Sequence, residues 1–146
     1  MKPLALTRLL LLLVANAAVA ELSADINETR AHYNYQMFCQ GCHTPNGMGG
    51  ESVPRIKGFI GHFMTLPEGR EFLVRVPGSA NSTLDDEQLA EVLNWMIVRF
   101  GGDSVPADMT PYAADEVGRL RQDPLYEVDR HRADLVAKFS NNTADH

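Results

Sequence analysis

The chain has 146 residues, of which 45% are hydrophobic, enough for one domain and too few for two ordinary hydrophobic cores. It carries 13 lysines and arginines against 19 aspartates and glutamates, a formal net charge of −6 at pH 7. This acidic balance argues against nucleic acid or an anionic membrane surface as a partner, and it allows a protein partner that has a basic docking patch.

The N-terminal stretch has the pattern of a secretory signal peptide over residues 1–20. Lys2 and Arg8 precede an apolar run, and an Ala-Val-Ala cleavage site ends at Ala20. The run is too short for a permanent membrane span. We therefore expect cleavage near Ala20 and export to the periplasm or another compartment outside the cytoplasm. Removal of the two basic residues leaves 11 basic against 19 acidic residues, a net charge of −8. Without cleavage, the same segment would tether the protein to a membrane.

The first helix of the mature chain is predicted over residues 26–42. Asn27 is a suitable N-cap because its side-chain oxygen can accept a hydrogen bond from a backbone N–H of the first turn. Positions at spacings of four and three carry side chains that fall on one face of this helix, namely Ala31, Tyr35 and Phe38. The helix therefore delivers the next motif at its C-terminal end.

That motif is Cys39-Gln40-Gly41-Cys42-His43, which has the spacing of a haem c attachment site. Two thiols separated by two residues can each add to one vinyl group of a haem, and the following imidazole can bind the iron. We predict thioethers at Cys39 and Cys42, with His43 as the proximal iron ligand. The alternatives are a thioredoxin-like redox pair, half of a zinc site and a disulfide. The zinc alternative fails because the chain has only two cysteines, and the redox-pair alternative leaves the adjacent histidine unexplained.

Glycines and prolines after His43 predict irregular chain. Residues 44–50 read Thr-Pro-Asn-Gly-Met-Gly-Gly, the composition of a tight loop, which would wrap the proximal side of the haem. In the next segment Pro54 precedes Ile56 by two positions and Gly58 by four. A ligating histidine needs an acceptor for its second ring nitrogen, and the carbonyl of Pro54 is the predicted acceptor.

Two further helices are predicted in the centre of the chain. A short one covers residues 67–76 and ends at Pro77-Gly78. A longer one is capped by Thr83, has acidic residues in its first turn and stops at residues 101–102, which are both glycine. Its apolar stripe consists of Leu89, Val92, Leu93 and Met96, with Trp95 and Phe100 beside it.

In this order the haem motif, the Pro-x-Ile-x-Gly segment and the later helix resemble a class I cytochrome c. The resemblance covers roughly residues 31–100 and implies an all-α fold around one covalent haem c, with Pro54 accepting a hydrogen bond from His43. It also implies that the N-terminal helix crosses the later helix through a small residue and aromatic side chains. The matching positions are Ala31 and Tyr35 on the first helix, and Val92 and Trp95 on the second.

The function implied by the resemblance is single-electron transfer by an exported carrier, which is not an enzyme. The iron would cycle between its ferrous and ferric states. A periplasmic dehydrogenase is the expected donor, and another cytochrome or a terminal oxidase is the expected acceptor.

The chain departs from this family on the distal side of the haem. Class I cytochromes usually place a methionine ligand a few residues before the last core helix, whereas residues 76–82 read Val-Pro-Gly-Ser-Ala-Asn-Ser. Met64 is the first alternative ligand and an open or water-bound site the second, ahead of His62, Met109 and His131. Met48 and Met96 are expected to belong to the proximal loop and to the core. An open site would favour a competing function, that of a small-ligand-binding or peroxidase-like haem protein.

Beyond the predicted core domain, residues 21–102, lies an extension over residues 103–146. Thr110-Pro111 and Asp123-Pro124 have the pattern of two helix starts, so the extension is predicted to add two helices. We expect these helices to cover a haem edge or the back of the core, and a docking element for a redox partner is the alternative.

Overall fold

The computed structural model describes residues 26–144, and the side chains of residues 26–139. The predicted signal peptide lies outside the described residues. The described part is helical and contains no strand, which confirms the predicted all-α class. No helix in it is long and apolar enough to cross a bilayer. In chain order the elements are α2 (Glu28–Phe38), α3 (Gln40–His43), the 3-10 helix η1 (Ile60–Thr65), α4 (Pro67–Arg75), α5 (Pro77–Ala80), α6 (Asp86–Gly101), the 3-10 helix η2 (Gly102–Ser104), α7 (Ala114–Leu120) and α8 (Val128–Ala144).

The crossing of α2 and α6 forms one half of the core. Ala31 and Val92 are fully buried where the two helices meet, and a small side chain there lets the backbones approach. The ring of Trp95 lies 5.3 Å from that of Tyr35, centroid to centroid. The predicted pairing of these two helices is therefore confirmed, and so is the Asn27 cap, whose side chain accepts a hydrogen bond from the backbone N–H of Arg30.

The predicted helix over residues 26–42 is divided in the structure. Helix α2 ends at Phe38, and the single turn of α3 begins at Gln40. Cys39 lies between them with φ −122° and ψ −38°, outside the helical geometry that would continue α2 into α3. The break changes the direction of the chain at Cys39. As a result α3, which carries His43, does not continue the face of α2 that packs on α6.

Helix α6 begins later than predicted. Its N-cap is Asp85, not Thr83: the Asp85 carboxylate accepts a hydrogen bond from the backbone N–H of Gln88, and the Gln88 side chain accepts one from the backbone N–H of Asp85. This reciprocal capping box satisfies two otherwise unpaired N–H groups, which explains why it outcompetes a lone threonine. The predicted apolar stripe is confirmed, since Leu89, Val92, Leu93 and Met96 are all buried.

Helix α4 matches its prediction, with Pro67 in its first turn and Phe72 and Leu73 buried. The Phe72 ring stacks on that of Phe63 at 5.1 Å, which joins α4 to η1. Pro77 ends α4 as expected, but it also begins α5, a single helical turn that was not predicted. A proline suits the first turn of a helix because that turn leaves its N–H groups unpaired.

Both helices of the extension begin later than their prolines suggested. Helix α7 starts at Ala114 and α8 at Val128. Long-range hydrogen bonds hold the proline segments outside helical geometry. Buried Asn94 accepts from the backbone N–H of Tyr112 at 2.8 Å and donates to its carbonyl at 3.0 Å, and the backbone N–H of Leu125 donates to a carbonyl at the end of α4. Tertiary contacts therefore override the local proline signal.

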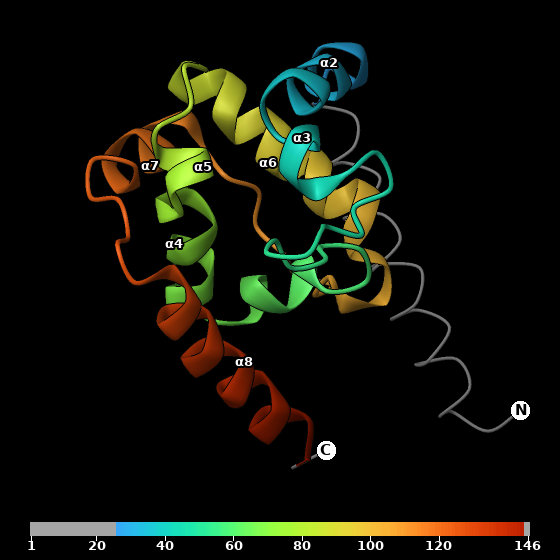
Figure 1. Cartoon of the computed structure of the whole chain (residues 1–146), viewed down its shortest axis with the longest axis vertical. Helices are drawn as coiled ribbons and strands as arrows, with labels where there is room; N and C mark the ends of the chain where they lie inside the picture. Colours follow the sequence, from blue (N-terminus) through green and yellow to red (C-terminus); the bar gives the residue numbers. More distant parts are fainter. Residues whose placement is uncertain (1–25, 145–146) are drawn as a thin grey trace, which may run out of the picture.

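Figure 1 shows how these elements surround the centre of the molecule. Helices α2 and α3 lie on one side, α4 and α5 on the other, and α6 passes between them. Helix α7 packs against α6 and α4, and α8 packs against α4. The extension thus covers α4 and α6 on the side away from α3.

Candidate haem-binding site

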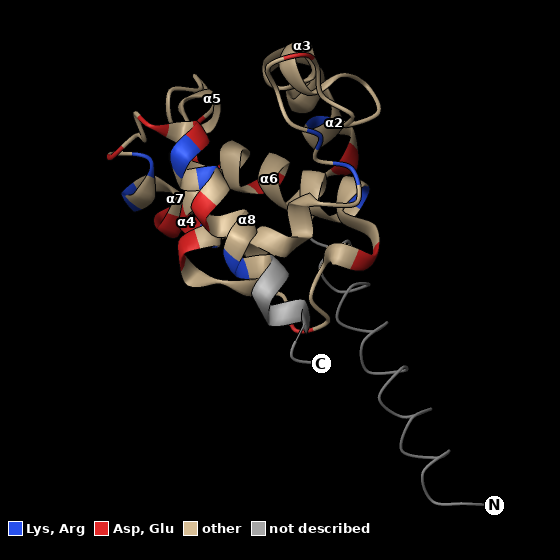
Figure 2. Cartoon of the chain, turned by 60° about the horizontal axis from the view of Figure 1, so that its bottom comes forward, with Lys and Arg blue, Asp and Glu red and all other residues tan. Residues whose placement is uncertain are grey.

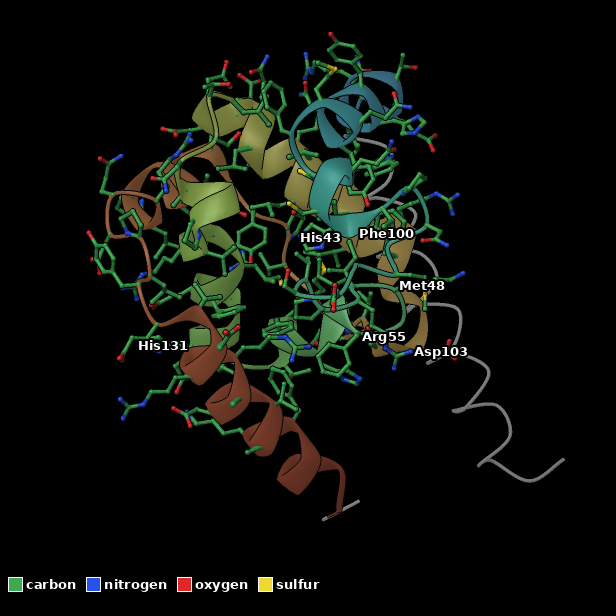
Figure 3. The ribbon with its side chains drawn as sticks, viewed as in Figure 1. His43, Met48, Arg55, Phe100, Asp103 and His131 are labelled. Atoms are coloured by element: carbon green, nitrogen blue, oxygen red, sulfur yellow. The ribbon has the colours of Figure 1, made fainter. Side chains whose placement is uncertain are left out.

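A cavity between α3, α5 and α6 contains the candidate functional residues. Three segments line this cavity. Cys39, Cys42 and His43 lie on one side, the connection from α4 to α6 lies on a second side, and the apolar stripe of α6 forms the third. The lining residues are Phe38, Cys39, Cys42, His43, Val76, Gly78, Ser79, Ser82, Leu84, Leu89, Val92, Leu93 and Met96. In Figure 3 His43 lies at the centre of the molecule. The structure therefore brings the whole haem motif to one largely apolar cavity.

His43 is held there in its neutral form. Its imidazole is half-buried, and desolvation lowers its pKa below the ordinary value, because a buried site disfavours the charged imidazolium. The Nδ1 atom is buried and has no hydrogen-bond partner among the described residues. A neutral imidazole is the form that binds a metal, and an unpartnered buried nitrogen calls for an acceptor or a ligand.

The two thiols differ in their surroundings. Cys39 is half-buried, and burial, followed by the charge of a neighbouring Cys42 thiolate, raises the pKa of Cys39 to about 11. Cys42 is exposed at the mouth of the cavity. The structure records both as free cysteines, so the disulfide alternative receives no support from it. Both side chains lie at the same cavity as His43, as two thioethers to one haem require.

Tyr35 fixes the loop that follows His43, a role that the sequence did not predict. The Tyr35 hydroxyl donates a 2.5 Å hydrogen bond to the carbonyl of Thr44, which ties α2 to the first loop residue. Desolvation raises the pKa of Tyr35 to about 12, so this hydroxyl keeps its proton and goes on donating in alkaline solution where an exposed tyrosine would ionise. Thr44 has φ +63°, a costly conformation for a β-branched residue, directly beside the candidate ligand.

Two glycines allow the same loop to close. Gly47 has φ +73°, and a Cβ there would lie 2.8 Å from a ring carbon of Phe100. Gly49, also at φ +73°, is packed against the backbone carbonyls of Val53 and Pro54. The loop therefore brings the Pro54 segment close to the His43 loop. The structure contains no hydrogen bond from His43 to Pro54, whose role as the acceptor stays a prediction.

The alternative distal ligands lie elsewhere. Met64 and Met109 line a separate cavity beside Arg70, and the two cavities share no lining residue. His62 packs against Phe59 and Phe139, and exposed His131 lies on α8 (Figure 3). None of these four residues lines the cavity of His43, and the identity of the distal ligand stays a prediction.

Met96 is the methionine that the sequence assigned to the core and that also reaches the candidate site. It is 5% exposed, packs in the stripe of α6 and lines the cavity of His43. Sequence periodicity identified its buried face but could not show that this face borders the haem motif. Met48, in contrast, is 48% exposed on the proximal loop, as expected.

This placement predicts different effects for two methionine substitutions. We expect Met64→Ala to leave the visible absorption spectrum of the purified protein unchanged and to cost about 1–3 kcal/mol, since its side chain is only partly buried. We expect Met96→Ala to cost about 2–5 kcal/mol and to shift the spectrum, because Met96 borders the cavity. A spectrum altered by Met64→Ala and not by Met96→Ala would show that the candidate cavity is misassigned.

The residues present fit a haem by their chemistry. Two cysteines and a neutral histidine with an unpartnered ring nitrogen line the same cavity as a set of apolar side chains. Phe38 also lines this cavity, and 45% of its surface is exposed to solvent. Among the side chains of residues 26–139, no group of three or more His, Cys, Asp or Glu residues is placed to hold a metal ion by itself.

Comparison with known proteins supports the same chemistry. The chain is similar to cytochrome c-552 of Thermus thermophilus, with 29% identity over 106 residues that cover 60% of this chain and 81% of the relative. A second cytochrome c-552, from a particular strain of the same species, is also 29% identical over 106 residues, with 60% and 72% covered. No family model matches the chain, and no solved structure matches it. The similarity is thus to a c-type cytochrome.

Proposed function

We propose that this protein is an exported monohaem c-type cytochrome of the class I type that carries single electrons between redox proteins. The observation that carries the proposal is the meeting of Cys39, Cys42 and a neutral, half-buried His43 at one apolar cavity, in the spacing of a haem c attachment site. The similarity to cytochrome c-552 supports it independently. The crossing of α2 and α6 through Trp95 agrees with the class I arrangement.

Each residue has a defined task in this proposal. Cys39 and Cys42 hold the haem covalently, His43 binds its iron, and the carbonyl of Pro54 is the proposed acceptor for the second imidazole nitrogen. When bound, the haem supplies a one-electron ferric–ferrous couple. The apolar stripe of α6 excludes water from the cavity, and this exclusion sets the local dielectric that tunes the reduction potential.

The residues that line the cavity include no lysine, arginine, aspartate or glutamate, although the chain as a whole is acidic. Residues 31–50 and 76–84 contain no lysine, arginine, aspartate or glutamate, and in Figure 2 α3 and α5 are tan whereas α4, α7 and α8 carry charged residues. The cavity mouth therefore lacks the charges that would recognise a basic docking patch. We propose that the partners are redox proteins that dock at this uncharged cavity mouth. A dehydrogenase would be the electron donor, and a cytochrome or an oxidase would be the acceptor.

A second function is favoured by the wall that faces the haem motif. Val76, Gly78, Ser79, Ser82 and Leu84 line that wall, and none of them carries a sulfur or an imidazole. A haem protein whose wall offers no ligand can bind a small exogenous molecule at the iron. The alternative function is therefore a small-ligand-binding or peroxidase-like haem protein.

Spectroscopy with redox titration separates the two functions. For a carrier we expect a reversible one-electron couple, a low-spin ferric spectrum with a sulfur-to-iron charge-transfer band, and slow or absent carbon monoxide binding to the reduced protein. A high-spin ferrous form that binds carbon monoxide rapidly would favour the alternative. A protein that exchanges electrons with no mediator would exclude electron transport.

A further inference from the structure

The connection between α5 and α6 is held by one arginine of the C-terminal extension. Arg121 follows α7, and its side chain is 11% exposed. It donates to the carbonyls of Ala80 at 3.2 Å, Ser82 at 2.5 Å and Leu84 at 2.8 Å, and to the carboxylate of Asp86 at 3.0 Å. A single side chain thus engages three successive alternate carbonyls and the first residue of α6.

The shape of the guanidinium makes this contact specific. It is planar and offers five N–H donors in a fixed fork, whereas a lysine ammonium is a point charge without that geometry. The backbone of residues 81–84 is irregular, so the carbonyls of Ser82 and Leu84 are not engaged in a helix ladder. Hydrogen bonds from a charged donor are stronger than neutral ones, and their loss leaves partly buried carbonyls unpaired.

The approach of α7 to this connection is close. A Cβ at Gly118 would collide with the Asp86 carboxylate, so a larger residue there would displace the Asp86 side chain. Val117, one residue earlier, is fully buried against the core. Gly118 and Arg121 both contact the Asp86 carboxylate, and these contacts seat α7 on the N-terminal end of α6.

The residues held in this way also line the candidate haem cavity. We call Val76, Gly78, Ser79, Ser82 and Leu84 the far wall, because they lie across the cavity from Cys39, Cys42 and His43. Arg121 binds the backbone of two of these residues, Ser82 and Leu84. A change in the extension is thereby transmitted to the wall that faces the histidine.

We propose that Arg121 is a positioning residue that fixes the far wall and so limits the entry of small neutral ligands, such as carbon monoxide, to the cavity. The part of this proposal that concerns ligand entry rests on the proposed haem site, whereas the part that concerns the wall does not. The C-terminal extension is then a component of the site's architecture in addition to a cover for α4 and α6.

Arg70 offers a matched control for this proposal. Its guanidinium also ties the extension to the core, through the Glu116 carboxylate and the carbonyls of Thr110 and Pro111. It lines the separate cavity of Met64 and Met109, and none of these hydrogen bonds reaches the far wall. Loss of either arginine weakens the attachment of the extension, but only loss of Arg121 releases residues 80–84.

The test compares Arg121→Ala, Arg121→Lys and Arg70→Ala in the full purified protein. We expect hydrogen exchange at residues 78–85 to accelerate about tenfold or more in Arg121→Ala and not in Arg70→Ala, with carbon monoxide binding accelerated in the same variant. Arg121→Lys keeps the charge and loses the forked geometry of the guanidinium, so we expect most of the same acceleration of hydrogen exchange and of carbon monoxide binding. If the alanine variant does not fold, the lysine variant provides the test.

The two readouts distinguish the possible failures. Unchanged exchange at residues 78–85 in both Arg121 variants, or an equal increase in Arg70→Ala, would overturn the role of Arg121. Faster exchange without faster carbon monoxide binding would overturn the control of ligand entry. A protein that holds no haem would refute the proposed function, while the exchange data would still decide whether Arg121 fixes the wall.

Discussion

Replacing Cys39 and Cys42 together with alanine is expected to abolish covalently bound haem. Both side chains line the cavity that also contains His43, and no other cysteine exists in the chain to form a thioether. Each single substitution should leave one linkage and a poorly maturing product. Gel electrophoresis under denaturing conditions followed by haem staining measures the covalently retained haem directly.

Met48→Ala provides the control for this loss. Met48 lies on the loop after His43 and is 48% exposed, so its removal changes the neighbourhood of the motif without touching the thiols. We expect this variant to stain like the wild type. Full haem retention in the double cysteine variant would contradict the assignment of the attachment site.

Replacing Trp95 with alanine is expected to lower the free energy of unfolding by about 3–5 kcal/mol. Trp95 is the only tryptophan in the chain, and it is 6% exposed. Its ring contacts those of Tyr35 and Phe100 at centroid distances of 5.3 and 5.7 Å. The substitution removes the largest ring of this aromatic cluster from the crossing of α2 and α6, and the loss is a large share of a small domain's stability. Denaturant titration followed by circular dichroism measures the change.

Tyr126→Ala is the matched aromatic control, because Tyr126 is 93% exposed. Its unfolding midpoint should stay at the wild-type value. If the midpoint of Trp95→Ala also stays there, the helix crossing is not the core of the folded protein. Covalent haem should remain attached in Trp95→Ala, since a thioether does not depend on the stability of the fold.

The parts of the fold that could be predicted from the sequence are those specified by neighbouring residues. The N-cap at Asn27 and the buried stripe of α6 follow from local spacing, and both are confirmed. The cap of α6 was placed at Thr83 because the sequence offers several suitable residues in succession, and only the geometry of the capping box selects Asp85.

The parts that could not be predicted depend on residues far apart in the chain. Asn94 holds the backbone of Tyr112 from 18 positions away, and Arg121 binds carbonyls 37 to 41 positions earlier. Neither residue differs in type from an ordinary polar residue on a helix. The haem motif could be recognised because its chemistry is contained in five consecutive residues, whereas the wall across from His43 is assembled only by folding.

The most direct test of the central claim is whether the purified wild-type protein keeps its haem after denaturation and acid–organic extraction. The presence of Cys39, Cys42 and His43 at one cavity predicts full retention. It also predicts a mass that exceeds the polypeptide mass by one haem, and a pyridine haemochrome spectrum of a haem whose two vinyl groups are saturated. Extraction of free haem, or an intact mass equal to that of the polypeptide alone, would contradict the proposed covalent cytochrome.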